Sequence, residues 1–221
     1  MKPKILLSWS SGKDSAWTLH VLRQSDAWEI VGLVTTVNTA FGRVSMHGVR
    51  EELLEQQADA AGLPLWKVLI PYPCPNESYE SAMRDLIQRA KEEGVTHFAF
   101  GDLFLQDVRE YREQQLAGTG ITPIFPLWGV DTRTLAQQMI ANGLRAVLTC
   151  VDPRQIPAAL IAREFDSALL SDLPPSADPC GENGEFHTFC YAAPMFSQPI
   201  AVRTGEVVER DGFVYADVLP A

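Results

Sequence analysis

The stretch that decides the fold is residues 4–17, KILLSWSSGKDSAW, in a chain of 221 residues. Its first part, residues 4–9, is an apolar run that predicts a strand buried on both faces. Residues 15–24 then predict a helix with apolar residues along one side. Between them lies a short turn rich in Ser and Gly. A turn of this kind binds anions, because backbone N–H groups and the positive end of the helix dipole converge on it.

This turn is not an ordinary P-loop. A Walker A loop requires Gly, four residues, and then Gly-Lys followed by Ser or Thr. Gly12 and Lys13 are present, but Leu7 occupies the earlier glycine position and Asp14 occupies the position of the magnesium-binding hydroxyl. We therefore expect the turn to bind a nucleotide phosphate without the usual chemistry at the γ-phosphate.

The turn offers several kinds of group to the phosphates of ATP. Gly12 allows close approach of the backbone and can take a positive φ. Lys13 supplies a cation, and Asp14 orients the loop or helps to hold Mg²⁺, which prefers oxygen ligands. Hydroxyl donors come from Ser10, Ser11 and Ser15. The alternative is a turn that only caps a helix, since Asp and Ser are ordinary first-turn residues; its position after a buried strand favours the phosphate site.

Short β-like runs alternate with helix-like segments over the first 150 residues, which predicts a parallel sheet with helices on both faces. The further strands are expected at residues 29–37, 65–70, 97–100, 121–125 and 146–151. The further helices are expected at residues 50–61, 77–93 (capped by Asn76), 107–116 and 131–142. Ligands of such folds bind beyond the carboxyl ends of the strands, where the strand order reverses. The turn at residues 10–14 and the pair Gly101-Asp102 lie at such ends.

The pattern changes near residue 171. Residues 171–190 are rich in Pro, Asp, Gly and Glu and have no periodicity. Residues 200–210 and 213–219 then flank Asp211-Gly212, a tight-turn signal that predicts an antiparallel hairpin. We therefore divide the chain into an ATP-binding α/β domain, residues 1–150, and a smaller C-terminal substrate-side segment, residues 151–221.

The amino-acid composition limits the classes of molecule that the chain is expected to bind. The net charge of −10 disfavours nucleic acid as the main partner, although a local cluster of donors can still bind ATP. No signal-peptide pattern or membrane-spanning run is present, so we expect a cytoplasmic protein. The cysteines lack a C-x-x-C pair and are expected to be reduced thiols; the spacing of Cys180 and Cys190 matches no zinc pattern. The sequence leaves open whether the chain forms a homodimer.

The signature S-x-G-K-D-S at residues 10–15 resembles that of the N-type ATP pyrophosphatases, also called PP-loop ATPases. The usual form there is Ser-Gly-Gly-Lys-Asp-Ser, so Ser11 departs from it at the first glycine. The resemblance implies a Rossmann-like fold of the HUP type. It also implies that the loop binds the pyrophosphate part of ATP while the α-phosphate is attacked.

Three further stretches resemble the diphthine–ammonia ligase family within that superfamily: RVSMHGVR at residues 43–50, GDLFLQDVREYR at 101–112 and CGENGEFHT at 180–188. The resemblance covers nearly the whole chain apart from the last hairpin. It implies an AMP-forming ligase that adenylates a carboxylate and amidates it with ammonia, using ATP and Mg²⁺. The implied substrate is diphthine on elongation factor 2 or a small-molecule carboxylate.

These stretches supply the remaining candidate site residues. Asp102 is expected to hold Mg²⁺ or a substrate cation, and Glu182 and Glu185 to orient ammonia or accept its proton. We expect an anionic substrate to contact His47, Arg50 and Arg109. Arg112, like Arg109, could bind phosphate or carboxylate in bidentate fashion. The loop candidates also include His187, as a catalytic group, and Thr188, as a substrate contact. Thr35 and Thr36 are expected beside the adenine or ribose.

Each assignment has a structural alternative. Asp102 could cap a helix, and Arg50 could pair with a neighbouring glutamate. Arg109 and Arg112 could belong to a salt-bridged surface helix, and residues 180–188 could be a solvated acidic loop. Two threonines in a strand are also commonplace.

Two other functions remain open. A tRNA-modifying PP-loop enzyme is disfavoured by the acidic balance and the absence of a basic stripe; binding of tRNA at physiological salt would identify it. A non-catalytic protein that binds ATP or AMP would bind nucleotide stoichiometrically and release no pyrophosphate.

Overall fold

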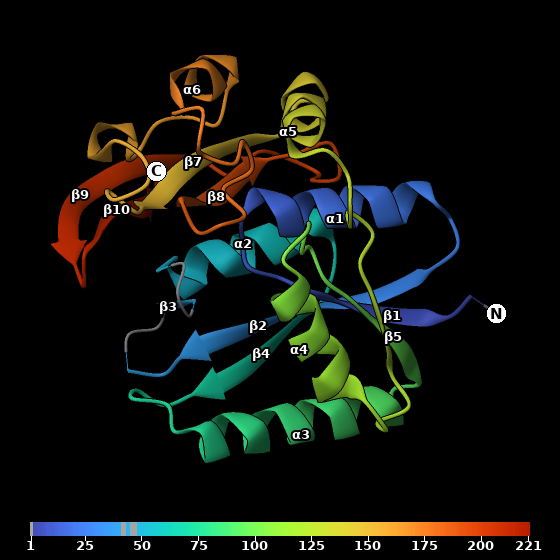
Figure 1. Ribbon diagram of the computed structural model, residues 1–221. Helices are drawn as coiled ribbons and strands as arrows, with labels where there is room; N and C mark the ends of the chain where they lie inside the picture. The colour runs from blue at the N-terminus through green and yellow to red at the C-terminus, as the bar shows by residue number, and fades with distance from the viewer. Residues whose placement is uncertain (1, 41–42, 45–47) are drawn as a thin grey trace.

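A computed structural model describes residues 2–40, 43–44 and 48–221 (Figure 1). Within them, six strands form a mainly parallel sheet. Its strands are β1 (Lys4–Ser8), β2 (Glu29–Asn38), β3 (Arg43–Val44), β4 (Leu65–Ile70), β5 (Val95–Ala99) and β6 (Thr122–Ile124). β1 pairs with β2 and β5, β2 with β4, and β5 with β6, all in parallel. The short β3 is antiparallel to β2.

Helices cover both faces of this sheet. These are α1 (Lys13–Gln24), α2 (Glu51–Ala61), α3 (Asn76–Glu92) and α4 (Gln106–Leu116). Ile5 and Leu7 of β1 belong to a core cluster with α1 and α2, whereas Leu6 packs with residues of α3 and α4. This alternation confirms the predicted two-sided burial of β1. The prediction that Asn76 caps its helix is wrong, because Pro75 holds the N-cap position and Asn76 is the first helical residue.

A second, antiparallel sheet has the order β8-β7-β10-β9. Its strands are β7 (Arg145–Val151), β8 (Phe186–Ala192), β9 (Val202–Arg210) and β10 (Phe213–Pro220). The hairpin at Asp211-Gly212 is confirmed. The placement of the strand at residues 146–151 in the parallel sheet is wrong, because β7 pairs with β8 and β10. β8 itself was not predicted.

The two sheets share one core. A single cluster contains Leu7 of β1, Leu19 of α1, Leu148 of β7 and Phe189 of β8. Figure 1 shows α1 and α2 between the two sheets. The helical elements α5 (Thr132–Ala141), η1 (Ala158–Leu160) and α6 (Ser167–Asp172) complete this half. The division at residue 150 stays a prediction; it falls one residue before the end of β7.

The sheet topology positions a site. Along the parallel pairings the order is β4, β2, β1, β5 and β6, so the chain reverses its direction of progress between β1 and β5. Ligands of open α/β sheets bind at such a reversal, beyond the carboxyl ends of the strands. None of the described helices has the length and apolar character needed to cross a membrane.

Candidate active site

Three segments far apart in the sequence line one cavity of about 220 Å³ at the ends of β1 and β5. They are the turn after β1, the pair Gly101-Asp102 after β5, and the loop that leads into β8. The described residues that line it are Ser8, Ser10, Gly12, Lys13, Asp14, Ser15, Phe100, Gly101, Asp102, Arg112, Cys180, Gly181, Glu182, Gly184, Phe186, His187 and Thr188. The cavity therefore joins three of the four stretches that the sequence singled out.

In the phosphate turn, the positive φ does not fall on the glycine. Gly12 has φ −84°, and the positive φ of 69° belongs to Ser11. A left-handed conformation costs a non-glycine residue about 1–2 kcal/mol, so Ser11 is held in place by its surroundings. Its carbonyl accepts hydrogen bonds from Cys190 N and Gln57 Nε2, each at 2.9 Å. The Ser11 hydroxyl is buried, and its oxygen has no hydrogen-bond partner among the described residues.

Strand β8 supports the turn from behind. A Cβ atom on Gly12 would lie 3.2 Å from Thr188 O and 3.4 Å from Thr188 Oγ1, so a larger residue would fit only if β8 moved by a few tenths of an ångström. Helix α1 has no N-cap side chain of its own. Instead, Lys13 N donates to Thr188 Oγ1 at 3.1 Å. Thr188 thus lines the cavity and also anchors the first turn of α1.

Lys13 is a buried cation at the wall of the cavity. Its Nζ atom donates to Asp14 Oδ2 at 2.8 Å and to the carbonyl of Cys180. It also lies 5.4 Å and 5.3 Å from the ring centroids of Phe165 and Phe186. Burial opposes the ammonium charge, but the attraction of Asp14, Cys180 and Glu182 together outweighs it and raises the pKa of Lys13. The side chain therefore stays charged.

Asp102 faces the cavity from the end of β5. Burial raises the pKa of Asp102. Its Oδ2 atom is buried without a hydrogen-bond partner among the described residues and lies 3.6 Å from Arg112 Nε. A Cβ atom on Gly101 would lie 3.2 Å from the backbone carbon of Asp14, so the preceding glycine brings the β5 loop against α1.

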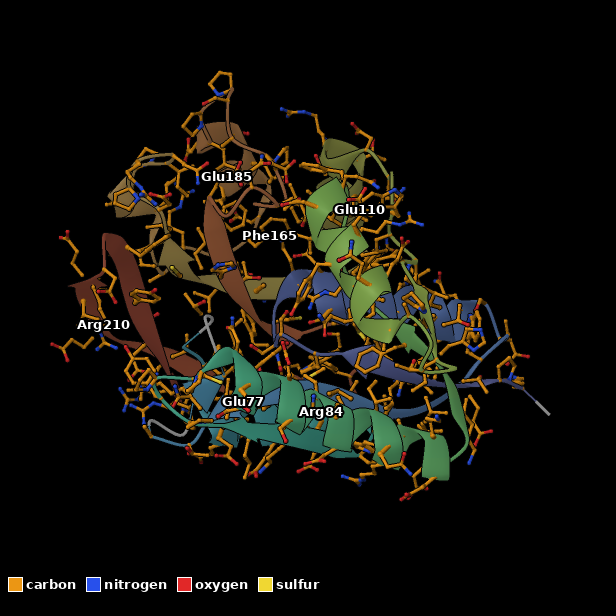
Figure 2. The ribbon with its side chains drawn as sticks, turned by 60° about the horizontal axis from the view of Figure 1, so that its bottom comes forward. Glu77, Arg84, Glu110, Phe165, Glu185 and Arg210 are labelled. Atoms are coloured by element: carbon orange, nitrogen blue, oxygen red, sulfur yellow. The ribbon has the colours of Figure 1, made fainter. Side chains whose placement is uncertain are left out.

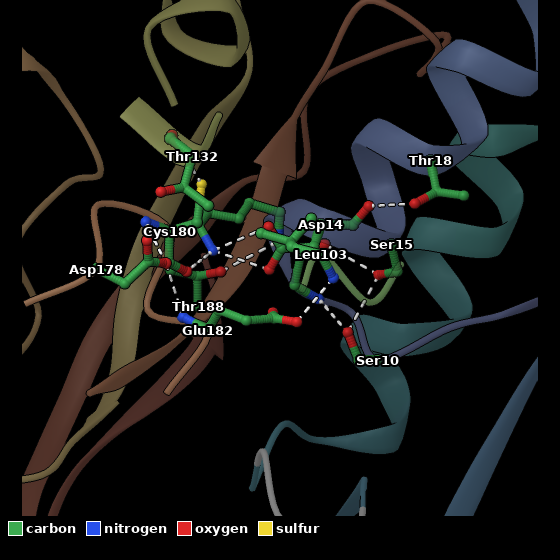
Figure 3. A network of polar contacts seen from close by, with 12 residues as sticks. Ser10, Asp14, Ser15, Thr18, Leu103, Thr132, Asp178, Cys180, Glu182 and Thr188 are labelled. Carbon is green, nitrogen blue, oxygen red and sulfur yellow. Dashed lines mark hydrogen bonds and ion pairs between the residues drawn. The ribbon is translucent and has the colours of Figure 1, made fainter. Parts of the chain in front are cut away.

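The loop before β8 is organised by Asp178. The Oδ2 atom of this residue accepts hydrogen bonds from Cys180 N and Glu182 N, each at 3.0 Å. Glu182 then reaches across the cavity, where its Oε1 atom accepts from Leu103 N at 2.7 Å (Figure 3). Burial raises the pKa of Glu182 to about 7, although the Leu103 N–H opposes the shift. This carboxyl can therefore exchange a proton near neutrality.

Glu185 and His187 have different surroundings. Glu185 is 1% exposed, and its Oε1 atom accepts from Asp178 N at 2.7 Å and from Asn183 Nδ2 at 3.1 Å. It lies in the loop region beside the second sheet and is not among the residues that line the cavity (Figure 2). His187 does line the cavity. Burial lowers the pKa of His187 to about 4, so its imidazole is neutral.

The structure does not bring every candidate to this cavity. Thr35 and Thr36 lie in β2 and are not among the lining residues. Arg50 forms a bidentate ion pair with Asp217 of β10. Among the described residues, it does not pair with the neighbouring glutamates that the sequence suggested as partners. Arg109 donates to Glu113 Oε1 at 2.8 Å, as the surface-helix alternative predicts. His47 lies outside the described residues.

Sequence reasoning gave no role to two residues that shape the site, Asp178 and Gln57, and a third, Arg112, was not kept as a candidate. Asp178 lies in the aperiodic loop and carries no motif signal. Gln57 is fully buried. The only hint of this in the sequence is that a polar residue occupies a position on the apolar side of α2. Arg112 was considered together with Arg109 as a bidentate ligand for phosphate or carboxylate, but only Arg109 was kept as the substrate contact.

The carboxylates present fit a magnesium ion that is shared with a nucleotide. Asp14 and Asp102 line the same cavity, and Asp102 Oδ2 is buried with no hydrogen-bond partner among the described residues, although Arg112 Nε lies 3.6 Å away. Among the described residues, no group of three or more His, Cys, Asp or Glu side chains could hold a metal ion. An ion here would therefore take its other ligands from phosphate oxygens and water, as Mg²⁺ commonly does.

Comparison with known proteins identifies the family of this chain. The sequence model of the diphthamide synthase N-terminal domain matches residues 1–122, and that of the C-terminal domain matches residues 131–217. A diphthine–ammonia ligase of Danio rerio is 26% identical over 186 residues, which are 77% of this chain and 72% of the relative. The protein of that name from Schizosaccharomyces pombe is 25% identical over 228 residues, which are 94% of this chain but 37% of the relative. Since the first model alone spans more than half of the sequence, this chain belongs to the diphthamide synthase family.

Proposed function

We propose that the chain is an ATP-dependent ligase that adenylates a substrate carboxylate, releases pyrophosphate and then forms an amide with ammonia. The observation that carries the proposal is the shared cavity. It combines an anion-binding turn, a buried cation, two carboxylates fit for Mg²⁺ and a carboxyl that titrates near neutrality. The names of the relatives support a ligase role.

The turn after β1 would bind the β- and γ-phosphates of ATP. Backbone N–H groups at the start of α1 supply donors, and the hydroxyls of Ser10 and Ser15 lie 3.2 Å apart at its rim. Lys13 would stabilise the charge that develops on the departing pyrophosphate. When bound, Mg²⁺ would be held by Asp14 and Asp102 and would neutralise phosphate charge.

Glu182 would act on the second half of the reaction. A carboxylate is a poor electrophile, and its adenylate carries AMP as a good leaving group. Ammonia attacking this carbonyl must lose a proton, and the ionised Glu182 carboxyl is a suitable acceptor. Glu185 would support the loop that carries Glu182, because its hydrogen bonds are to backbone and side-chain groups of that loop.

The acceptor substrate follows from the relatives' name. We propose diphthine on elongation factor 2, with a small-molecule carboxylate as the second candidate. The chain's acidic balance suits neither DNA nor RNA as the acceptor.

The test is the identity of the nucleotide product. The chain is incubated with ATP, Mg²⁺, ammonium chloride and diphthine-carrying elongation factor 2, and AMP and ADP are separated by chromatography. We expect AMP and pyrophosphate in equal amounts, together with acceptor-dependent ATP–pyrophosphate exchange. ADP as the product would overturn the proposal, and nucleotide binding without turnover would identify a non-catalytic binding protein.

A matched pair of variants links the product to the cavity. Lys13→Met removes the buried cation and should lower AMP formation by about 100-fold or more. Lys67→Met is the control, because Lys67 pairs with Glu51 and Glu55 and does not line the cavity. Circular dichroism would check that both variants fold. Equal rates for the two variants would exclude Lys13 from the reaction.

A further inference from the structure

Two side chains supply formal positive charge among the described residues that line the cavity: Lys13 and Arg112. Lys13 is already engaged, since its Nζ atom donates to Asp14 and to the carbonyl of Cys180. A cavity that holds both ATP and a carboxylate must compensate several negative charges. Arg112 is the second cation available for that task.

The position of Arg112 is fixed by two neighbours. Its guanidinium carbon lies 5.0 Å from the ring centroid of Phe100, which stacks on Phe98 at 4.9 Å. Its Nε atom lies 3.6 Å from Asp102 Oδ2, beyond the range of a good hydrogen bond. Both of these atoms are buried, and neither has a hydrogen-bond partner among the described residues. The two groups form an ion pair without a good hydrogen bond, so each keeps hydrogen-bonding capacity for a further ligand.

Resting on the proposed function, we infer that Arg112 binds an oxyanion in the cavity. The planar guanidinium can donate two parallel hydrogen bonds to a carboxylate or a phosphate. Asp102 and Phe100 act as positioning residues, because one attracts the guanidinium and the other supports its flat face. The oxyanion is either a phosphate of ATP or the carboxylate of the acceptor.

Arg109 provides the contrast that makes this inference specific. It lies one turn earlier on α4 and also stacks on aromatic rings, with its guanidinium carbon 4.8 Å from the centroids of both Phe125 and Trp128. However, Arg109 donates to Glu113 at 2.8 Å and does not line the cavity. Arg109→Gln therefore removes the same charge from the same helix without removing the proposed ligand.

The experiment compares Arg112→Gln, Arg112→Lys and Arg109→Gln with the unmodified chain. The first arm measures binding of α,β-methylene-ATP by calorimetry and needs no turnover. The second arm measures KM for diphthine-carrying elongation factor 2 at saturating ATP. Loss of a hydrogen-bonded charge should weaken the affected step by about 10- to 100-fold for Arg112→Gln. The weakening caused by Arg112→Lys should be smaller than that caused by Arg112→Gln but still measurable, because lysine keeps the charge but loses the paired donors.

A defect in the first arm that is confined to the Arg112 variants identifies a phosphate of ATP as the oxyanion. Normal nucleotide binding with a raised KM identifies the acceptor carboxylate. If Arg112→Gln behaves like Arg109→Gln in every arm that gives a signal, the inference is overturned. Nucleotide binding that depends on Arg112 in a chain that forms no AMP would instead reject the ligase proposal and keep this one.

Discussion

At the scale of single residues, the Glu182 carboxyl changes its charge close to neutral pH. Burial raises its pKa to about 7, above the value of an exposed glutamate. Below this pKa the group is protonated and cannot accept another proton; above it, the carboxylate is available. The same side chain is fixed by the Leu103 N–H, so its ionisation occurs at a defined place in the cavity.

This ionisation predicts the pH dependence of amide formation. At a constant concentration of free ammonia, turnover should rise with pH and level off above about 7, because only ionised Glu182 accepts the proton. Glu182→Gln should lower turnover by about 100-fold and abolish that rise, with little change in ATP binding. Rates measured from acidic to mildly alkaline pH test this, with Glu185→Gln as the comparison. An unchanged pH profile in Glu182→Gln would show that another group titrates.

Single residues also mark a limit of sequence reasoning. The turn around Gly12, the pair Gly101-Asp102 and the loop around Glu182 were predicted to be functional, and they line one cavity. The choice between Arg109 and Arg112 was not predictable, because both lie on a charged helix one turn apart. Only the packed structure distinguishes the arginine paired with Glu113 from the one beside Asp102.

At the scale of elements, α1 depends on β8 for its N-terminal cap. Gly12 offers no side chain, and Thr188 Oγ1 accepts from Lys13 N instead. The cap therefore comes from a strand about 175 residues later in the chain. Helix formation at the phosphate turn is thus coupled to the second sheet.

Removal of this cap should destabilise the protein. Thr188→Val is close in shape but has no acceptor, so the free energy of unfolding should fall by about 1–2 kcal/mol. Thr188→Ser keeps the hydroxyl, so its free energy of unfolding should fall by less than that of Thr188→Val. Urea denaturation followed by circular dichroism measures both variants. Equal losses for Val and Ser would mean that the methyl packing, and not the cap, is what matters.

The parallel sheet was predictable because its strands alternate with helices, and each boundary carries a Gly, Pro or polar signal. The helix that ends at Ala61 before Gly62 is one example, since Gly62 takes the left-handed conformation typical of a C-cap. The partner of β7 was not predictable, because a short apolar run such as residues 146–148 fits a parallel or an antiparallel core strand equally well. β8 was missed because the glycine-rich loop before it hides the strand pattern.

At the scale of the whole molecule, Gln57 connects three parts of the fold. From α2, its Oε1 atom accepts from Trp9 Nε1 at 2.9 Å, and its Nε2 atom donates to Ser11 O and Cys190 O. The residue is fully buried, so none of these partners can turn to water instead. One amide thus links the end of β1, the phosphate turn and β8.

Gln57→Leu should therefore affect the molecule as a whole. It keeps the volume but leaves buried polar groups unpaired, which should lower the free energy of unfolding by about 3 kcal/mol or more. Gln56→Leu, at the less buried neighbouring position of α2, is the control and should change stability by less than about 0.5 kcal/mol. Chemical denaturation gives both values. A similar small loss for the two variants would refute the linking role.

The contact of the phosphate turn with β8 has a consequence for engineering. Ser11, Gly12 and Lys13 each contact a backbone or hydroxyl atom of residues 188–190. The phosphate turn and β8 are therefore closely complementary to each other. A chimaera that takes either the parallel sheet or the second sheet from a distant relative would disturb this contact between the phosphate turn and β8, even if both parts fold. Chimaeras designed to change the acceptor substrate should therefore exchange peripheral loops only. The phosphate turn and β8 should both come from the same protein.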